Sequence, residues 1–99
     1  MTLTGKQARY LRGLGHHLHA IVMIGKDELT DRVIATTDEA LTSHELIKVK
    51  LQDGCLSDRR EIAAELAQAT SASVAQVLGR TFLLYRRHPE NPQISLPKA

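Results

Sequence analysis

The apolar residues of this chain switch repeatedly between helical and strand spacing, and this alternation restricts the possible fold more than any other feature. Spacings of three or four residues predict helices, whereas alternation or short β-branched runs predict strands. The predicted helices are 4–17, 30–44 and 57–70, and the predicted strands are 20–24, 45–51, 73–78 and 81–86. Strands separated by helices imply at least partly parallel pairing. The sequence therefore predicts an α/β fold, a two-layer α-β-α-β-α-β-β domain with a four-stranded mixed sheet.

The predicted strands differ in how they should meet the core. The run 20–24 (AIVMI) is apolar throughout and predicts a buried strand. In 45–51, apolar residues alternate with Lys48 and Lys50, so one face should be buried and the other exposed. Gly79-Arg80 predicts a type II′ hairpin turn between the last two strands.

The predicted helices carry capping residues and apolar stripes. Thr4 should cap the first helix and Ser57 the third, because hydroxyl oxygens accept hydrogen bonds from the free amides of a helix start. The apolar stripe predicted for the first helix consists of Ala8, Leu11, Leu14 and Leu18.

Length and composition indicate one small soluble domain spanning 1–99. The lone cysteine, Cys55, excludes an internal disulfide and favours a reducing compartment. No signal-peptide pattern and no bilayer-length apolar stretch stand out, so we expect a cytoplasmic protein without a membrane partner. Three prolines after His88 predict an irregular, partly mobile tail over about 88–99.

The charge is distributed unevenly although the net charge is only +2. Residues 1–26 carry four cations and no acid, whereas residues 27–46 carry six acids and one cation. Residues 71–99 carry four cations and one acid. A polarised chain can present a basic face to an anion such as RNA. The alternative is a mixed, solvated surface without functional consequence.

The segment Gly25–Glu28 is the most informative local feature because it joins a predicted strand to a predicted helix. Amides at a helix start are unpaired and the helix dipole there favours anions. Gly25 would allow a tight turn, and Lys26 adds a positive charge. This combination predicts a phosphate-binding loop, similar in logic to the GXXG loop of KH domains. An ordinary turn between strand and helix is the alternative.

Other cations could extend such a contact along an RNA backbone. A solvated helix or sheet face is the alternative for each of them. Tyr85 could stack on a base or pack its ring. The candidate cations are Lys6, Arg9, Arg12, Lys48, Lys50, Arg80, Arg86 and Arg87.

Metal binding and catalysis have little support in the sequence. The cluster His16, His17 and His19 lacks a spaced second ligand pair, so we expect no metal site and no cofactor. No hydrolase, P-loop, zinc-protease or dinucleotide signature is present. Neighbouring carboxylates at Asp38 and Glu39 point about 100° apart on a helix. We therefore expect neither an enzyme nor a small-molecule substrate.

Several segments, taken together, resemble YhbY-type proteins of the CRM (chloroplast RNA splicing and ribosome maturation) family, in matching order and spacing. The segments are Lys6-Gln7, 11–16 (LRGLGH), 22–25 (VMIG), 44–50 (HELIKVK), Gly79 with 83–86 (LLYR), and 94–97 (ISLP).

The resemblance implies a CRM-like RNA-binding domain with the fold of the C-terminal domain of translation initiation factor three. It further implies a role in large ribosomal subunit assembly, with precursor ribosomal RNA as partner and ribosomal proteins as further partners. In that family the loop after the first strand is held to bind RNA, which corresponds to Gly25–Glu28 here. The family usually has GxxG followed by Leu-Thr. Leu29-Thr30 is present, but Glu28 replaces the second glycine. This predicts either a weaker phosphate contact or a Glu28 side chain that points away from the loop.

A different class of function stays open at this point. The acidic second helix, with Asp38 and Glu39, could instead dock on a ribosomal or translation protein. Reversing these charges should then abolish association but spare RNA binding.

Overall fold

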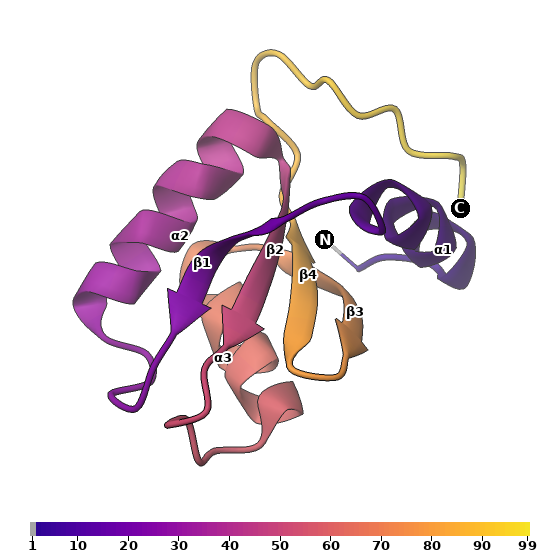
Figure 1. Cartoon of the computed structure of the whole chain (residues 1–99). Helices are drawn as coiled ribbons and strands as arrows, with labels where there is room; N and C mark the ends of the chain where they lie inside the picture. Colours follow the sequence, from indigo (N-terminus) through magenta and orange to yellow (C-terminus); the bar gives the residue numbers. More distant parts are fainter. Residues whose placement is uncertain (1) are drawn as a thin grey trace.

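A computed structural model describes residues 2–99 and contains the predicted order of helices and strands (Figure 1). Within these residues, no helix is long and apolar enough to cross a membrane. The elements are α1 (Gly5–Gly15), β1 (Ala20–Ile24), α2 (Asp31–His44), β2 (Leu46–Leu51), α3 (Arg59–Thr70), β3 (Ser73–Leu78) and β4 (Thr81–Tyr85).

The four strands form one mixed sheet in the order β1-β2-β4-β3, which confirms the predicted α/β fold. The pair β1–β2 is parallel and is connected through α2, as a strand–helix–strand unit requires. The pairs β2–β4 and β3–β4 are antiparallel. Gly79 has φ +59° whereas Arg80 stays at negative φ, which is the pattern of the predicted type II′ turn.

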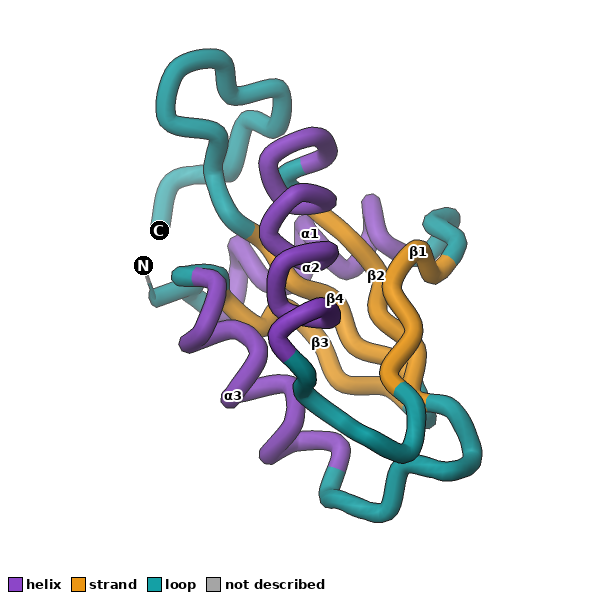
Figure 2. The backbone as a smooth tube through the Cα atoms, turned by 90° about the vertical axis from the view of Figure 1, so that its left-hand side faces the viewer, coloured by secondary structure: helices purple, strands orange, loops and turns teal. Residues whose placement is uncertain are grey.

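The sheet separates two apolar cores. On one face, α2 and α3 cover the larger core, which includes Ile24, Val49 and Phe82. Figure 2 shows both helices on the same side of the strands. On the other face, Leu11 of α1 packs with Leu83 and other residues in a smaller core. The predicted two-layer arrangement is thus the sheet with α2 and α3, while α1 lies on the opposite face.

The helix caps explain where the helices begin. Thr4 caps α1 in a capping box with Gln7, and Thr30 accepts a hydrogen bond from the amide of Val33. The prediction for α3 was wrong by one residue, since Asp58 and not Ser57 is the N-cap. A carboxylate at this position also interacts favourably with the helix dipole.

The apolar stripe predicted for α1 is only partly correct. Leu11 is fully buried, but Leu14 and Leu18 remain about two-fifths exposed. Gly15 takes the buried position instead, and a Cβ there would clash with the side chain of Leu83. The absence of a side chain therefore allows α1 to approach the sheet.

The prediction of a buried strand at 20–24 was also wrong in part. Val22 and Ile24 are buried, but Ile21 is 50% and Met23 48% exposed. The reason is topological: β1 lies at the edge of the sheet, and α1 packs on the other three strands. An apolar run alone cannot distinguish a central strand from an edge strand.

The tail after β4 has no helix or strand, as predicted, but Glu45 holds it in place. Glu45 is 3% exposed and accepts hydrogen bonds from the amides of His88, Gln93 and Ile94. Ile94 and Leu96 then pack on the smaller core. Burial raises the pKa of the Glu45 carboxyl, but the three amides and the charge of His88 together leave that pKa below its ordinary value.

Candidate nucleic-acid interface

The loop between β1 and α2 is a tight turn whose special conformation falls on Glu28. The amide of Glu28 donates to the carbonyl of Gly25 at 3.0 Å, which closes the turn. Glu28 has φ +57°, whereas Gly25 stays outside the positive-φ region. The sequence had assigned the conformational demand to Gly25, and the structure moves it to Glu28. Residue 28 is therefore the position where a glycine would fit without strain.

The carboxylate of Glu28 points toward the following loop. It accepts a hydrogen bond from the hydroxyl of Ser57, the residue predicted to cap α3. A carboxylate engaged in this way is directed to one side of the turn. Within residues 2–99, the amides of Lys26 and Asp27 in the same turn make no hydrogen bond to another backbone group. Two free amides beside a lysine can hold an anion.

The 25–28 turn rests on the turn that follows β2. The amide of Gln52 donates to the carbonyl of Ile24 at 2.8 Å, which extends the β1–β2 pairing. A Cβ at Gly54 would lie 3.1 Å from the Cβ of Lys26, so glycine there permits close contact between the turns. The backbone of Lys26 is thus fixed while its side chain is exposed.

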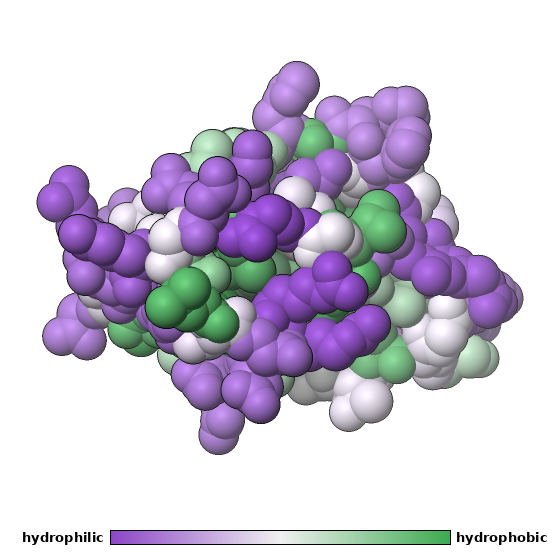
Figure 3. All heavy atoms as spheres, turned by 60° about the horizontal axis from the view of Figure 1, so that its bottom comes forward, coloured by the Kyte–Doolittle hydropathy of each residue, from purple (hydrophilic) through white to green (hydrophobic). Residues whose placement is uncertain are grey.

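Figure 3 brings this loop end of the molecule forward and shows a mostly hydrophilic surface with separate hydrophobic groups. The charges there are mixed. Lys26 is exposed next to Asp27, and Asp53 pairs with Arg80 at 3.8 Å. The loop alone is therefore not a strongly basic surface, and further cations must come from elsewhere.

The α1 side of the sheet supplies such cations. Lys6, Arg9 and Arg12 of α1 are exposed. Lys48 and Lys50 project on the same side of the sheet as Leu46, which packs in the α1 core. We call these five residues the basic face. Neither α1, β1 nor β2 contains an acid.

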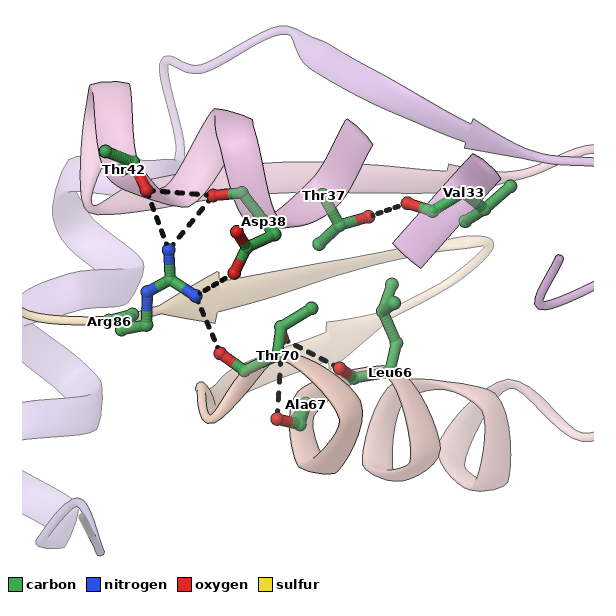
Figure 4. Close-up of polar contacts among 8 residues, drawn as sticks. All are labelled: Val33, Thr37, Asp38, Thr42, Leu66, Ala67, Thr70 and Arg86. Carbon is green, nitrogen blue, oxygen red and sulfur yellow. Dashed lines mark hydrogen bonds and ion pairs between the residues drawn. The ribbon is translucent and has the colours of Figure 1, made fainter. Parts of the chain in front are cut away.

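Arg86, one of the predicted RNA contacts, is engaged inside the protein. Its guanidinium donates to the carboxylate of Asp38 at 2.6 Å and to the carbonyl of Thr70 at 2.8 Å (Figure 4). It also donates to the carbonyl of Asp38 and to the hydroxyl of Thr42. Arg86 therefore ties α2 to the end of α3, and few of its N–H groups are left for a phosphate.

Arg80 is engaged in a similar way. Its guanidinium donates to the carbonyls of Leu51 and Gln52, which attaches the β3–β4 hairpin to the end of β2. Arg87, by contrast, is exposed near the tail and borders a pocket with Tyr85 and Ile94.

Tyr85 is not available to stack on a base. It is 1% exposed and belongs to the smaller core, which agrees with the alternative of a packed ring. Burial and then the charge of Glu45 raise the pKa of its phenol, and Arg87 opposes them.

The remaining candidates do not converge on a chemical site. His16 and His17 stack edge to face with ring centroids 5.2 Å apart. In the part of the chain that the structure describes, no group of three or more His, Cys, Asp or Glu could hold a metal ion. Cys55 is a buried member of the larger core.

Two long-range contacts that shape this region could not be predicted from the sequence. The contact between Glu28 and Ser57 joins residues 29 positions apart, and the Glu45 anchor reaches up to 49 positions along the chain. A glutamate in the usual glycine position was the one signal for the first contact. The histidine–glutamate pair that precedes β2 gave no signal for the second.

Comparisons with known proteins find a matching family model and several similar sequences. The model of the CRS1 / YhbY (CRM) domain matches residues 3–86. A Bacillus subtilis protein with the name "Probable RNA-binding protein YqeI" is 41% identical, with 96% of this chain and 99% of the relative covered. A Haemophilus influenzae protein also named as RNA-binding is 39% identical, with 98% and 97% covered. These names describe RNA-binding proteins and not enzymes, in agreement with the sequence prediction.

A solved structure shows the same fold. The solution structure of a Staphylococcus aureus protein superposes with a TM-score of 0.83 at 41% identity, covering 96% of this chain and 99% of that one. This likeness supports the mixed sheet with three helices described above.

Proposed function

This chain belongs to the CRS1 / YhbY (CRM) domain family, and we propose that it binds structured RNA of the large ribosomal subunit precursor and acts in the assembly of that subunit in the cytoplasm. The names of its relatives support RNA as the partner. The ribosomal role rests on the resemblance to YhbY-type proteins, and ribosomal proteins are proposed as further partners.

The observation that carries the proposal is the basic face. Five cations project from the α1 side, and the elements that bear them contain no acid. Cations without neighbouring acids keep their charge available for phosphates. Each neutralised phosphate releases counterions, so the affinity should fall steeply with salt.

The 25–28 turn adds a second contact in this proposal. Lys26 and the amides beside Gly25 hold one phosphate, and the Glu28 carboxylate stays directed at Ser57. Arg87 extends the contact near the tail. Arg80 and Arg86 remain in the proposed set with less weight, because their guanidinium groups already hold other parts of the chain.

Titration of a structured large-subunit RNA fragment against Lys26→Ala tests the loop. Arg60→Ala, which removes an exposed cation from α3, is the matched control. We expect about a tenfold loss of affinity for Lys26→Ala and little change for the control. An unchanged affinity for Lys26→Ala would remove the loop from the mechanism.

The cellular role is tested by sucrose-gradient fractionation of a lysate at low and high salt. The proposal expects the protein to migrate with large-subunit precursors and to be released by salt. Migration at the top of the gradient even at low salt would contradict the ribosomal role.

Docking of the acidic α2 on a protein stays a prediction. Asp38 already pairs with Arg86, so reversing its charge would also break the contacts of that arginine. Glu39→Lys is the cleaner variant because Glu39 is exposed. Loss of a ribosomal association with unchanged RNA affinity would favour this second function.

A further inference from the structure

The proposed phosphate contacts leave the exposed edge of β1 unexplained. Ile21 is 50% exposed and Met23 48%, although both belong to a five-residue strand. Large apolar side chains that are exposed side by side mark an interaction surface more often than isolated ones do.

A groove runs along this edge between β1 and α2. It is bordered by residues of β1, including Ile21 and Met23, and by one cation of α2, and these residues include no acid. The lining residues are Ile21, Val22, Met23, Arg32, Val33 and Thr36.

Further cations surround the edge. Lys50 pairs in register with Met23, and Lys48 pairs with Ala20, so each lysine lies one strand away on the basic face. Lys26 lies in the loop two residues after the end of β1. Apolar side chains with cations on both sides match a ligand that has flat apolar groups on a negatively charged backbone. An unpaired stretch of RNA has this chemistry.

A protein strand fits this edge less well. The register between β1 and β2 shifts between Ala20 and Val22, and such irregularities twist an edge away from further pairing. The strand is also short. Its side chains and not its backbone are therefore the groups offered to a partner.

We propose that the β1 edge binds a single-stranded segment of RNA, with bases against Ile21 and Met23 and phosphates held by Arg32 and Lys50. This inference rests on the proposed function. It adds unpaired nucleotides to the structured RNA held by the basic face and the 25–28 loop.

The test compares two RNA probes. The first is a stem-loop with an unpaired extension of about ten uridines, and the second is the same stem-loop with that extension paired to a complementary strand. The variant is Ile21→Thr with Met23→Thr, because threonine keeps the strand propensity and removes apolar surface without changing charge. The control is Leu78→Thr, which removes another exposed apolar side chain, at the opposite edge of the sheet.

We expect the double variant to bind the unpaired probe about tenfold more weakly than the parent does. Its affinity for the paired probe should be unchanged, and the salt dependence of binding should equal that of the parent. Leu78→Thr should bind both probes as the parent does. Equal binding of the unpaired probe by parent and double variant would overturn the inference while leaving the proposed function intact. Failure of the parent to bind either probe would instead contradict the proposed function.

Backbone amide NMR of the unmodified protein provides a measurement that does not depend on how the variant folds. Addition of a short single-stranded oligouridine should shift the amides of 20–24 and Lys50. Shifts confined to α1 would overturn the inference. Loss of a co-purifying protein by the double variant, with RNA affinity unchanged, would assign the edge to a protein and overturn it as well.

Discussion

The two faces of the sheet use cations in different ways. On the α2 and α3 side, Arg86 is surrounded by acceptors from Asp38, Thr42 and Thr70, and its side chain is 22% exposed. On the α1 side, Lys6, Arg9 and Arg12 are exposed, and the helix that carries them contains no acid. Residues of one chemical type thus stabilise the fold on one face and remain open to a ligand on the other.

This difference shows why a count of cations is a poor guide to a binding site. The sequence placed both Arg86 and Arg12 among the candidate RNA contacts. The neighbouring acceptors decide their roles. Arg86 lies beside the Asp38 carboxylate and the carbonyl of Thr70 at the end of α3, and its charge-assisted hydrogen bonds to them are stronger than neutral ones. Substitutions on the two faces should therefore separate stability from RNA affinity.

Glu45→Gln should have the largest effect, because the α1 side depends on the tail that Glu45 holds. Three amides would lose a charged acceptor, and we expect unfolding to become easier by about 2–4 kcal/mol. Chemical denaturation measures this, with Glu39→Gln as the control for loss of an exposed acid. A change as small as that of the control would show that the tail is not anchored here.

The same anchor predicts a pH dependence. The pKa of Glu45 is lower in the folded chain than its ordinary value of 4.5. The ionised carboxylate therefore stabilises the folded chain fully above pH 4.5. The stabilisation should disappear as the pH falls below 4.5 and through the folded pKa. Denaturation of the parent across this range should show a decline that Glu45→Gln lacks, and parallel pH profiles would contradict the assignment.

Arg86→Met should lower stability but leave RNA affinity almost unchanged. The variant keeps the aliphatic stem and leaves the Thr70 carbonyl and the Asp38 carboxylate without their donor. We expect a cost of about 2 kcal/mol, measured by thermal or chemical unfolding. A large loss of RNA affinity in a folded Arg86→Met protein would break the comparison between the faces.

The triple variant Lys6→Gln, Arg9→Gln, Arg12→Gln should show the opposite pattern. These side chains are exposed, so stability should change by less than about 1 kcal/mol. RNA affinity should fall by about 30-fold. The slope of log affinity against log salt should become shallower by the equivalent of up to about three phosphate contacts. Fluorescence anisotropy at several salt concentrations measures both, and an unchanged salt slope would remove α1 from the interface.

Glu28→Gly should have the smallest effect, and it tests whether Glu28 limits RNA binding by the 25–28 turn. It removes a negative charge and relieves φ +57°, and we expect RNA affinity to rise about two- to fivefold with a stability change within about 1 kcal/mol. Glu28→Gln separates the two causes, because it removes the charge but keeps the strained backbone. An increase for both variants indicates repulsion of phosphate, whereas an increase for glycine alone indicates backbone strain. Unchanged affinity in both would show that Glu28 does not limit the loop.

The sequence by itself determined the order of elements and the fold class, because periodicity is a local property. Alternation in 45–51 correctly placed Val49 toward a core and Lys48 and Lys50 on the other face. Thr4 correctly marked the start of α1, since a cap acts within one turn. The family resemblance was carried by local motifs in the same way, and the family model confirms it.

The tertiary structure alone decided which of these residues are free. Partners distant along the chain decide that β1 is an edge strand and that Arg86 has acceptors. They also decide where the carboxylates of Glu28 and Glu45 point. Such contacts form only when the sheet brings α2, α3 and the tail together, and no local pattern records them. The sequence could therefore name the cations of this protein, but only the folded chain separates those that stabilise it from those that can meet RNA.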